Sequence, residues 1–200
     1  MNYFIVDFLR TLKNFVVTKI FYKNARLIRQ PFYLRGKKNI SWGENFTTGY
    51  GCRIESFAQT DNAVEEILKI GKNCQINDFV HIAAIKKIII GDNVLIASKV
   101  FISDHNHGNY SSEIHSSPDI NPQERKLYSN PIKIEDNVWI GESVSILPGV
   151  TIGRGTIIGA NTTVTKNIPE ECIVVGNPGK IIKKFNRKSL KWEKYENHNN

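Results

Sequence analysis

Residues Ile132–Asn167 read IKIEDN-VWIGES-VSILPG-VTIGRG-TIIGAN-TTVTKN, which is one six-residue phrase written six times. The third place of every phrase is aliphatic, and small or polar residues fill most of the last three places. A period of six fits neither an α-helix nor a plain strand. It is typical of a parallel β-helix, in which short strands alternate with tight turns. The stretch therefore predicts a solenoid with inward-pointing third-place residues: Ile134, Ile140, Ile146, Ile152, Ile158 and Val164.

The same phrase recurs upstream in blocks that begin at Ile88, at Leu68 and, in a weaker form, at Ile40. Three phrases make one triangular coil, so the chain is expected to hold about five coils. Residues 58–67 break the register and indicate a short excursion from a corner. The polar stretch 106–131 breaks it again, and a loop of that length in a compact domain is usually functional. We therefore expect a mainly β domain over residues 40–167, with a long protruding loop at 106–131.

The segments on either side of the repeat have a different composition. The N-terminal segment is apolar but is interrupted by the charged residues Asp7, Arg10, Lys13 and Lys19. This pattern excludes a spanning helix or a signal peptide. Its apolar residues fall at helical spacing, so we expect an amphipathic helix that either caps the solenoid or lies on an anionic membrane, two roles that are compatible. Residues 1–39 are thus interpreted as a helix with a basic connector, and residues 168–200 as a basic tail.

The net charge of +8 favours an anionic ligand, substrate or surface. Nucleic acid would fit the charge, but the chain carries no aromatic-basic recognition motif and no zinc pattern, so no nucleic-acid partner is expected. The three cysteines, Cys52, Cys74 and Cys172, are far apart and form no C-x-x-C motif. They are therefore predicted to be free thiols in a reducing compartment.

One cluster of side chains stands out at the start of the long loop, namely Asp104, His105 and His107. The core of a β-helix is filled by stacked side chains, so binding must occur on a face, beside a loop or between subunits. A surface histidine at this place can serve as a general base near neutral pH. A lone loop histidine is usually only solvated, but here two histidines, a carboxylate and the long loop coincide.

The motifs N-V-W-I-G, P-G-V-T-I-G, I-G-A, V-T-K-N-I-P and G-N-P follow one another between residues 137 and 178. With them the chain resembles the hexapeptide-repeat acyltransferases over roughly residues 68–185, most of all the galactoside, maltose and serine-type O-acetyltransferases. The resemblance implies a left-handed parallel β-helix, a homotrimer with active sites between subunits, and direct transfer from acetyl-CoA to a hydroxyl. The N-terminal helix and the length of the loop are more like enzymes that acetylate surface polysaccharides.

The resemblance also implies roles for single residues. Aligning Gly91–Ala97 without gaps puts the family's catalytic histidine on His107, with His105 as the alternative. Contact with the acceptor is implied for Asn77, Asp104 and Trp139. A coenzyme A channel is implied along Trp139, Gly141, Gly159, Ala160, Thr165 and Lys166. Lys183 and Lys184 replace the basic residues that meet the adenosine phosphate, and lysine supplies charge without the planar fork of arginine.

The expected function is therefore acetyl-CoA-dependent O-acetylation of a sugar in a capsule or O-antigen precursor, with histidine as the base and no metal. The expected location is cytoplasmic, at the inner face of the membrane. One alternative is a cytosolic enzyme that acetylates small sugars or antibiotics. Another is a metal-binding protein of the carbonic-anhydrase-like type, which would use histidines such as His81, His105 and His107. The coenzyme A motifs favour the acyltransferase.

Overall fold

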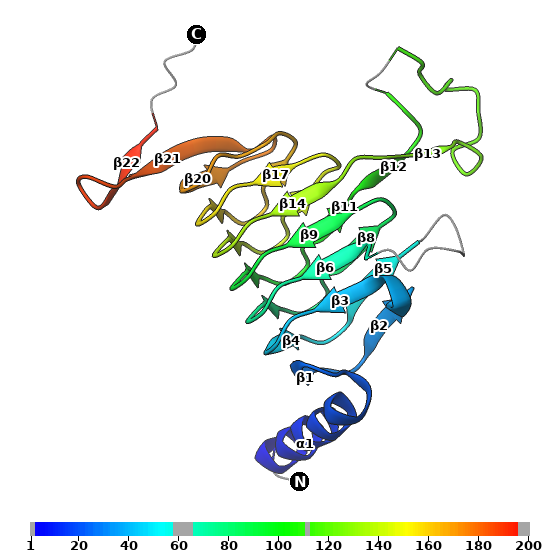
Figure 1. Ribbon diagram of the computed structural model, residues 1–200, viewed down its shortest axis with the longest axis vertical. Helices are drawn as coiled ribbons and strands as arrows, with labels where there is room; N and C mark the ends of the chain where they lie inside the picture. Colours follow the sequence, from blue (N-terminus) through cyan, green and yellow to red (C-terminus); the bar gives the residue numbers. More distant parts are fainter. Residues whose placement is uncertain (1–2, 58–65, 111–112, 196–200) are drawn as a thin grey trace.

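The computed structural model describes residues 3–57, 66–110 and 113–195. One N-terminal helix, α1 (Tyr3–Phe21), lies at one end of a column of stacked coils, and a hairpin lies at the other end (Figure 1). Most of the excursion expected at 58–67 lies outside the described residues.

Three sheets form the walls of the column, and each coil contributes to the walls in turn. Sheet A contains, in order, β1 (Ala25–Ile28), β4 (Phe46–Thr48), β7 (Gln75–Ile76), β10 (Leu95–Ile96), β15 (Trp139–Ile140), β18 (Ile157–Ile158), β20 (Cys172–Val175), β21 (Lys180–Asn186) and β22 (Lys191–Lys194). Sheet B contains β2 (Phe32–Arg35), β5 (Cys52–Ser56), β8 (His81–Ala84), β11 (Phe101–Ser103), β16 (Ser145–Ile146) and β19 (Thr163–Val164). Sheet C contains β3 (Ile40–Trp42), which follows a short 3-10 helix (Lys37–Asn39), and then β6 (Leu68–Ile70), β9 (Ile88–Ile90), β14 (Ile132–Ile134) and β17 (Thr151–Ile152).

The core contains the predicted third-place side chains, all of which are fully buried, together with first-place residues such as Val138, Val144 and Val150. The strands of successive coils pair in parallel, and Ile140 lies opposite Ile158 while Ile146 lies opposite Val164. Equivalent residues therefore stack about 4.8 Å apart along the column. The predicted parallel β-helix is confirmed.

Asparagines shape the corner between sheets C and A. Asn45, Asn73, Asn93 and Asn137 all have left-handed backbone conformations, with φ between 57° and 61°. Asparagine tolerates this region better than other non-glycine residues. Their side-chain amides form a ladder from coil to coil, with N···O distances of 3.0, 3.0 and 3.2 Å. The asparagine of the hexapeptide phrase thus both turns the chain and ties neighbouring coils together.

The walls extend beyond the range 40–167 that the repeat indicates. At the N-terminal end, β1 pairs with β4 and β2 pairs with β5, so the expected connector supplies wall strands. At the C-terminal end, β20 continues sheet A in parallel, and β21 and β22 then add to it in antiparallel fashion. None of these strands carries the hexapeptide phrase, which is why the repeat gives no sign of them.

Helix α1 packs on β1 through its polar side. Asn14 and Thr18 are buried, the Thr18 hydroxyl accepts from the Ile28 N–H at 2.8 Å, and the Asn14 amide oxygen accepts from the Gln30 N–H at 3.2 Å. The other side of α1 is apolar and exposed: Phe4, Ile5, Val6, Phe8, Leu9, Leu12, Phe15, Val16 and Ile20. The amphipathic helix is therefore present with its apolar side turned away from the solenoid. No helix of the described residues is long and apolar enough to cross a membrane.

The long loop leaves the column between β11 and β14 (Figure 1). Its two ends form an antiparallel pair, β12 (His105–His107) with β13 (Leu127–Ser129). The Asn130 N–H donates to the Asp104 carbonyl at 2.8 Å and closes the base of this hairpin. The hairpin therefore holds the predicted histidines at a fixed place beside the coils.

Candidate functional site

Asp104 anchors the hairpin to the preceding coil. Its side chain is fully buried, and its two carboxylate oxygens accept hydrogen bonds from the backbone N–H groups of Ile85, Lys86 and Lys87 at 2.9, 2.7 and 2.8 Å. Burial alone would raise the pKa of the Asp104 carboxyl. The hydrogen bonds from His105 and from these three amides together outweigh burial and lower that pKa. The carboxylate is thus held ionised by the chain itself, and its burial does not fit the expected contact with an acceptor.

His105 is oriented by this carboxylate. Its Nδ1 lies 3.0 Å from the Asp104 Oδ1 and 3.2 Å from the Ser103 hydroxyl. The imidazole meets the Phe57 ring edge-on at a centroid distance of 6.4 Å, and only 15% of the side chain is exposed. A histidine fixed at Nδ1 and packed on an aromatic ring is well placed to hold the hairpin in position.

His107 follows two residues later in β12, so its side chain lies on the same face of the strand as that of His105. It is exposed, and its backbone carbonyl accepts from the Tyr110 hydroxyl at 2.6 Å. Arg125 in turn donates to the Tyr110 oxygen at 2.8 Å. The loop therefore fixes the backbone of His107 and leaves the imidazole accessible to a substrate.

His81 lies on sheet B, away from these two histidines. Its Nε2 is 3.1 Å from the Glu55 carboxylate, and its ring packs on Phe101. In the described part of the chain, no group of three or more His, Cys, Asp or Glu residues is arranged to hold a metal ion.

A single row of side chains runs along the outer face of sheet A. Paired Cα positions connect Leu27, Thr47, Gln75, Leu95, Trp139, Ile157, Ile173 and Lys183. Trp139 is 49% exposed and stands in the middle of this row, between Leu95 and Ile157. Lys183 shares the row, whereas Lys184 is paired with Cys172 on the opposite side of β21. The structure therefore separates the two lysines that the resemblance assigns to one phosphate.

Other predicted residues lie at the corners of the coils. Asn77, Gly141, Gly159 and Ala160 are at the corner between sheets A and B, because they follow strands of sheet A directly. Gly141 is buried, and a Cβ there would lie 2.6 Å from the Ala160 nitrogen, so the stacking of the coils requires glycine. That packing accounts for Gly141 without any ligand.

Thr165 and Lys166 are exposed at the corner that follows sheet B. Lys166 lines a pocket of about 520 Å³ together with Lys180 and Tyr195. Lys184 lines a separate groove of about 530 Å³ with Arg187 and Lys188. Two basic hollows therefore lie at the C-terminal end of the column.

Within one chain the predicted site is split between the two edges of sheet B. The histidines follow β11 at the edge toward sheet C, whereas Asn77 follows β7 at the edge toward sheet A. Trp139 lies on the outer face of sheet A itself. One chain therefore presents two predicted half-sites on different sides of the column.

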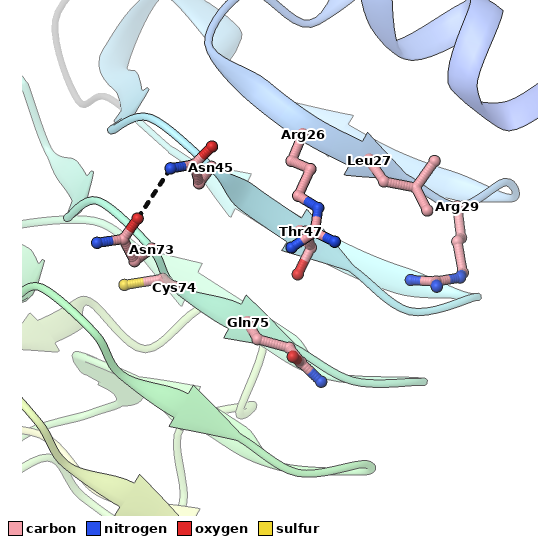
Figure 2. A pocket seen from close by; sticks show the side chains of 8 residues that line it. All are labelled: Arg26, Leu27, Arg29, Asn45, Thr47, Asn73, Cys74 and Gln75. Atoms are coloured by element: carbon pink, nitrogen blue, oxygen red, sulfur yellow. Dashed lines mark hydrogen bonds between the residues drawn. The ribbon is translucent and has the colours of Figure 1, made fainter.

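A pocket that the sequence does not indicate lies at the N-terminal end of sheet A (Figure 2). It has a volume of about 490 Å³ and is lined by Arg26, Leu27, Arg29, Asn45, Thr47, Asn73, Cys74 and Gln75. Arg26 and Arg29 belong to the range 1–39 that is interpreted as a helix with a basic connector, and the excess of basic residues there is the one signal of this pocket in the sequence.

The triangular column, the exposed hairpin histidine and the tryptophan-centred outer face define the class of hexapeptide-repeat transferases. Residues 131–166 match the family model described as bacterial transferase hexapeptide (six repeats). The chain is 45% identical over 194 residues, 96% of either chain, to WbbJ of Escherichia coli, whose name provisionally assigns it to lipopolysaccharide biosynthesis as an O-acetyl transferase. The chain belongs to the hexapeptide-repeat acyltransferase family, and its fold is the left-handed parallel β-helix.

Two further comparisons agree with this assignment. The chain is 40% identical over 119 residues to the galactoside O-acetyltransferase of Escherichia coli. The aligned region covers 60% of this chain and 55% of that protein. The fold matches AntD, an N-acyltransferase from Bacillus cereus solved with dTDP and 3-hydroxybutyryl-CoA, with a TM-score of 0.68 and 23% identity over 88% of this chain and 89% of that chain.

Proposed function

We propose that the protein is an acetyl-CoA-dependent O-acetyltransferase that acetylates a sugar hydroxyl in a surface-polysaccharide precursor. The observation that carries the proposal is the 45% identity to WbbJ over 96% of both chains. The name of WbbJ points to lipopolysaccharide biosynthesis, and the galactoside enzyme is named for O-acetylation of a sugar. The exposed histidine on an anchored hairpin supplies the base that such a reaction requires.

His107 is the proposed general base. Its imidazole takes the proton of the acceptor hydroxyl while the oxygen attacks the thioester carbonyl of acetyl-CoA. The C–S bond then breaks, the acetyl group stays on the sugar oxygen, and the departing thiolate receives the proton from His107. Asp104 and His105 hold the hairpin and act as positioning residues. General-base catalysis of this kind typically contributes about 10²–10⁴-fold to the rate.

The outer face of sheet A fits the donor. Trp139 and Ile157 form an apolar stripe suited to the pantetheine arm, and Lys183 continues the same row at its C-terminal end. Lys166 and Lys180 offer charge to the phosphates in the adjoining pocket. Gly159, Ala160 and Thr165 remain proposed channel residues, and Asn77 and Trp139 remain proposed acceptor contacts.

A homotrimer would join the two half-sites. The hairpin of one copy would face the sheet A side of a neighbour, which brings His107 close to Trp139 across the interface. Threefold closure gives three equivalent sites, because each interface uses two different surfaces of the same chain.

We also propose that α1 lies on the inner face of the cytoplasmic membrane. Its apolar side covers more than half of the helix circumference, far wider than the narrow seam of a helix pair. Lys19 lies within that side, with its ammonium over the Phe15 ring, and Lys13 lies near its edge, which suits anionic lipid headgroups and disfavours a second copy of the same helix. Because the polar side is already bound to β1, the apolar side cannot turn inward.

The activity is tested by following release of free coenzyme A from acetyl-CoA in the presence of capsule and O-antigen sugars, with nucleotide- and lipid-linked forms included. We expect release that depends on the acceptor and that is lost in His107→Ala. If no acceptor supports release above the background of wild-type protein with acetyl-CoA alone, and acetyl-CoA does not bind, the proposed function is wrong.

A further inference from the structure

The pocket formed by Arg26 and Arg29 has the chemistry of an anion site. Figure 2 shows Arg26 on β1 and Arg29 just after β1, both extending toward the strand that carries Thr47. The eight lining residues include no carboxylate, and besides the arginines they offer three amides, a hydroxyl and the thiol of Cys74. Its volume of about 490 Å³ lies within the range of about 300–1,000 Å³ that small-molecule sites occupy.

No carboxylate in the described part of the chain neutralises these two arginines. Elsewhere Arg10 pairs with Asp7, Arg53 with Glu55, and Arg187 with Glu171. Among the described residues, by contrast, neither Arg26 nor Arg29 forms an ion pair.

The groups that line the pocket are held in place by neighbouring strands. Arg29 donates one N–H to the Thr48 carbonyl at 3.0 Å, which fixes its direction and leaves further donors of its guanidinium for a ligand. The Asn45 and Asn73 amides are hydrogen-bonded to each other at 3.0 Å. Arg29 and the two amides are therefore in place before any ligand arrives, and the exposed Arg26 side chain adds positive charge beside them.

The pocket leads directly into the proposed acetyl-transfer face. Leu27, Thr47 and Gln75 lie in the same row as Trp139, and two strand spacings, about 10 Å, separate Gln75 from Trp139. The Gln75 amide also donates to the Asn77 side-chain oxygen at 2.9 Å. One continuous face thus carries two arginines at one end, the tryptophan in the middle and Lys183 at the other end.

We infer that Arg26 and Arg29 bind the diphosphate group of the acceptor, so that the substrate is a diphosphate-linked sugar and not a free sugar. The inference rests on the proposed function and specifies its acceptor. The planar guanidinium fork matches phosphate oxygens, and the lack of a competing carboxylate leaves the pocket available to them. The diphosphate holds the acceptor at the N-terminal end of the face, and the sugar extends along the row toward Trp139. A nucleoside diphosphate and a polyprenyl diphosphate share this chemistry.

The binding test compares wild-type protein with Arg26→Gln/Arg29→Gln and with a control of equal charge change on sheet C, Lys69→Gln/Lys133→Gln. In titration calorimetry, wild-type protein and the control should bind inorganic pyrophosphate with the same affinity. The arginine variant should bind it at least tenfold more weakly. Arg26→Gln alone, at an exposed side chain, provides a second variant if the double variant does not fold. Equal pyrophosphate affinity in the arginine variants and the control would overturn the inference.

The kinetic test uses the same variants with acetyl-CoA and three acceptors: a free sugar, a nucleoside diphosphate sugar and a polyprenyl diphosphate sugar. We expect KM for one diphosphate-linked acceptor to rise at least tenfold in the arginine variants with kcat preserved, and the acceptor affected identifies the natural source. Free-sugar KM should not change. A rise that is equal for free and diphosphate-linked sugars contradicts the inference. Pyrophosphate binding requires no turnover, so a failure of the proposed function remains distinguishable from a failure of this inference.

Discussion

At the scale of single residues, Asp104 decides how the hairpin that carries His105 and His107 is held. It joins three backbone amides of the preceding coil to the imidazole of His105, so one buried carboxylate links two coils and the loop. A buried charge with this many donors is stabilising only while it remains ionised. The residue therefore makes the geometry of the loop depend on one carboxylate.

We expect Asp104→Asn to lower the free energy of unfolding by about 1.5–3 kcal/mol at neutral pH, the value of a hydrogen bond to a charged group. The folded pKa of Asp104 lies below its ordinary value of 3.8, so its contribution is complete above that pH and is lost as the pH falls through the folded pKa. The difference in the free energy of unfolding between wild type and Asp104→Asn should therefore become smaller below pH 3.8. Urea unfolding at pH 7 and pH 3 measures this difference, and Asp119→Asn on the loop is the control. A gap that is the same at both pH values would argue against an ionised Asp104.

The two histidines should separate by function. His107→Ala should lower kcat by about 10²–10⁴-fold without a change in thermal stability, because the exposed imidazole is the proposed base. His105→Ala should lower both activity and stability. His105→Asn should recover much of both, because its amide can donate to Asp104 where Nδ1 does. If His105→Asn is as inactive as His105→Ala while His107→Ala keeps full activity, the two roles are reversed.

The sequence predicts some of these residues and not others, for physical reasons. The buried third-place aliphatics repeat every six residues, so their burial could be predicted. The pair His105 and His107 could be singled out because it opens the long loop. The burial of Asp104 could not be predicted, because its partners at 85–87 belong to another coil and only the stacking of the coils brings them near.

At the scale of elements, α1 is amphipathic as the sequence predicts, but the direction of its apolar side could not be predicted from the periodicity. Periodicity shows that two sides differ and does not show which side meets the solenoid. The buried hydrogen bonds of Asn14 and Thr18 to residues 28–30 decide the orientation. The nine apolar side chains are left exposed, as the proposed membrane contact requires.

We expect the full chain to sediment with vesicles that contain anionic lipid and to bind neutral vesicles more weakly. Phe8→Ser/Leu12→Ser should reduce binding at least tenfold, because burying each of these side chains contributes about 1.5–3 kcal/mol. Ile114→Ser, at an apolar loop residue that is 82% exposed, is the control and should bind like wild type. Unchanged binding by the helix variant, or equal binding to neutral and anionic vesicles, speaks against the membrane role.

Strand β21 divides the basic residues that follow the repeat. Alternation along the strand puts Lys183 on the face of Trp139 and Lys184 on the other face. We expect Lys183→Ala to raise the KM for acetyl-CoA by roughly tenfold, since a charge-assisted bond to phosphate is lost. Lys184→Ala is the matched control and should have little effect. An equal effect of both substitutions would contradict the division of the strand.

At the scale of the whole molecule, the strands of the regular central coils could be predicted from the sequence, whereas the strands at the two ends of the column could not. The coils between residues 68 and 167 repeat one phrase, so one local rule generates the whole column. The strands β1, β2 and β20 are formed because the last coils offer unpaired edges that any extended segment can cover. Their sequences follow no phrase, and their pairing is set by the column already in place.

The predicted site residues lie on two sides of one column, which has a consequence for the proposed assembly. In light scattering we expect about three times the chain mass of 22.8 kDa. The sharper test mixes two inactive variants, His107→Ala and Trp139→Ala, by joint unfolding and refolding. If each site takes its histidine from one copy and its tryptophan from the next, an equal random mixture restores roughly a quarter of the sites, because each intact half is present with a probability of about one half. Each variant refolded alone should stay inactive. A mixture no more active than its components would mean that one chain carries the complete site, and the shared-site trimer would then be wrong.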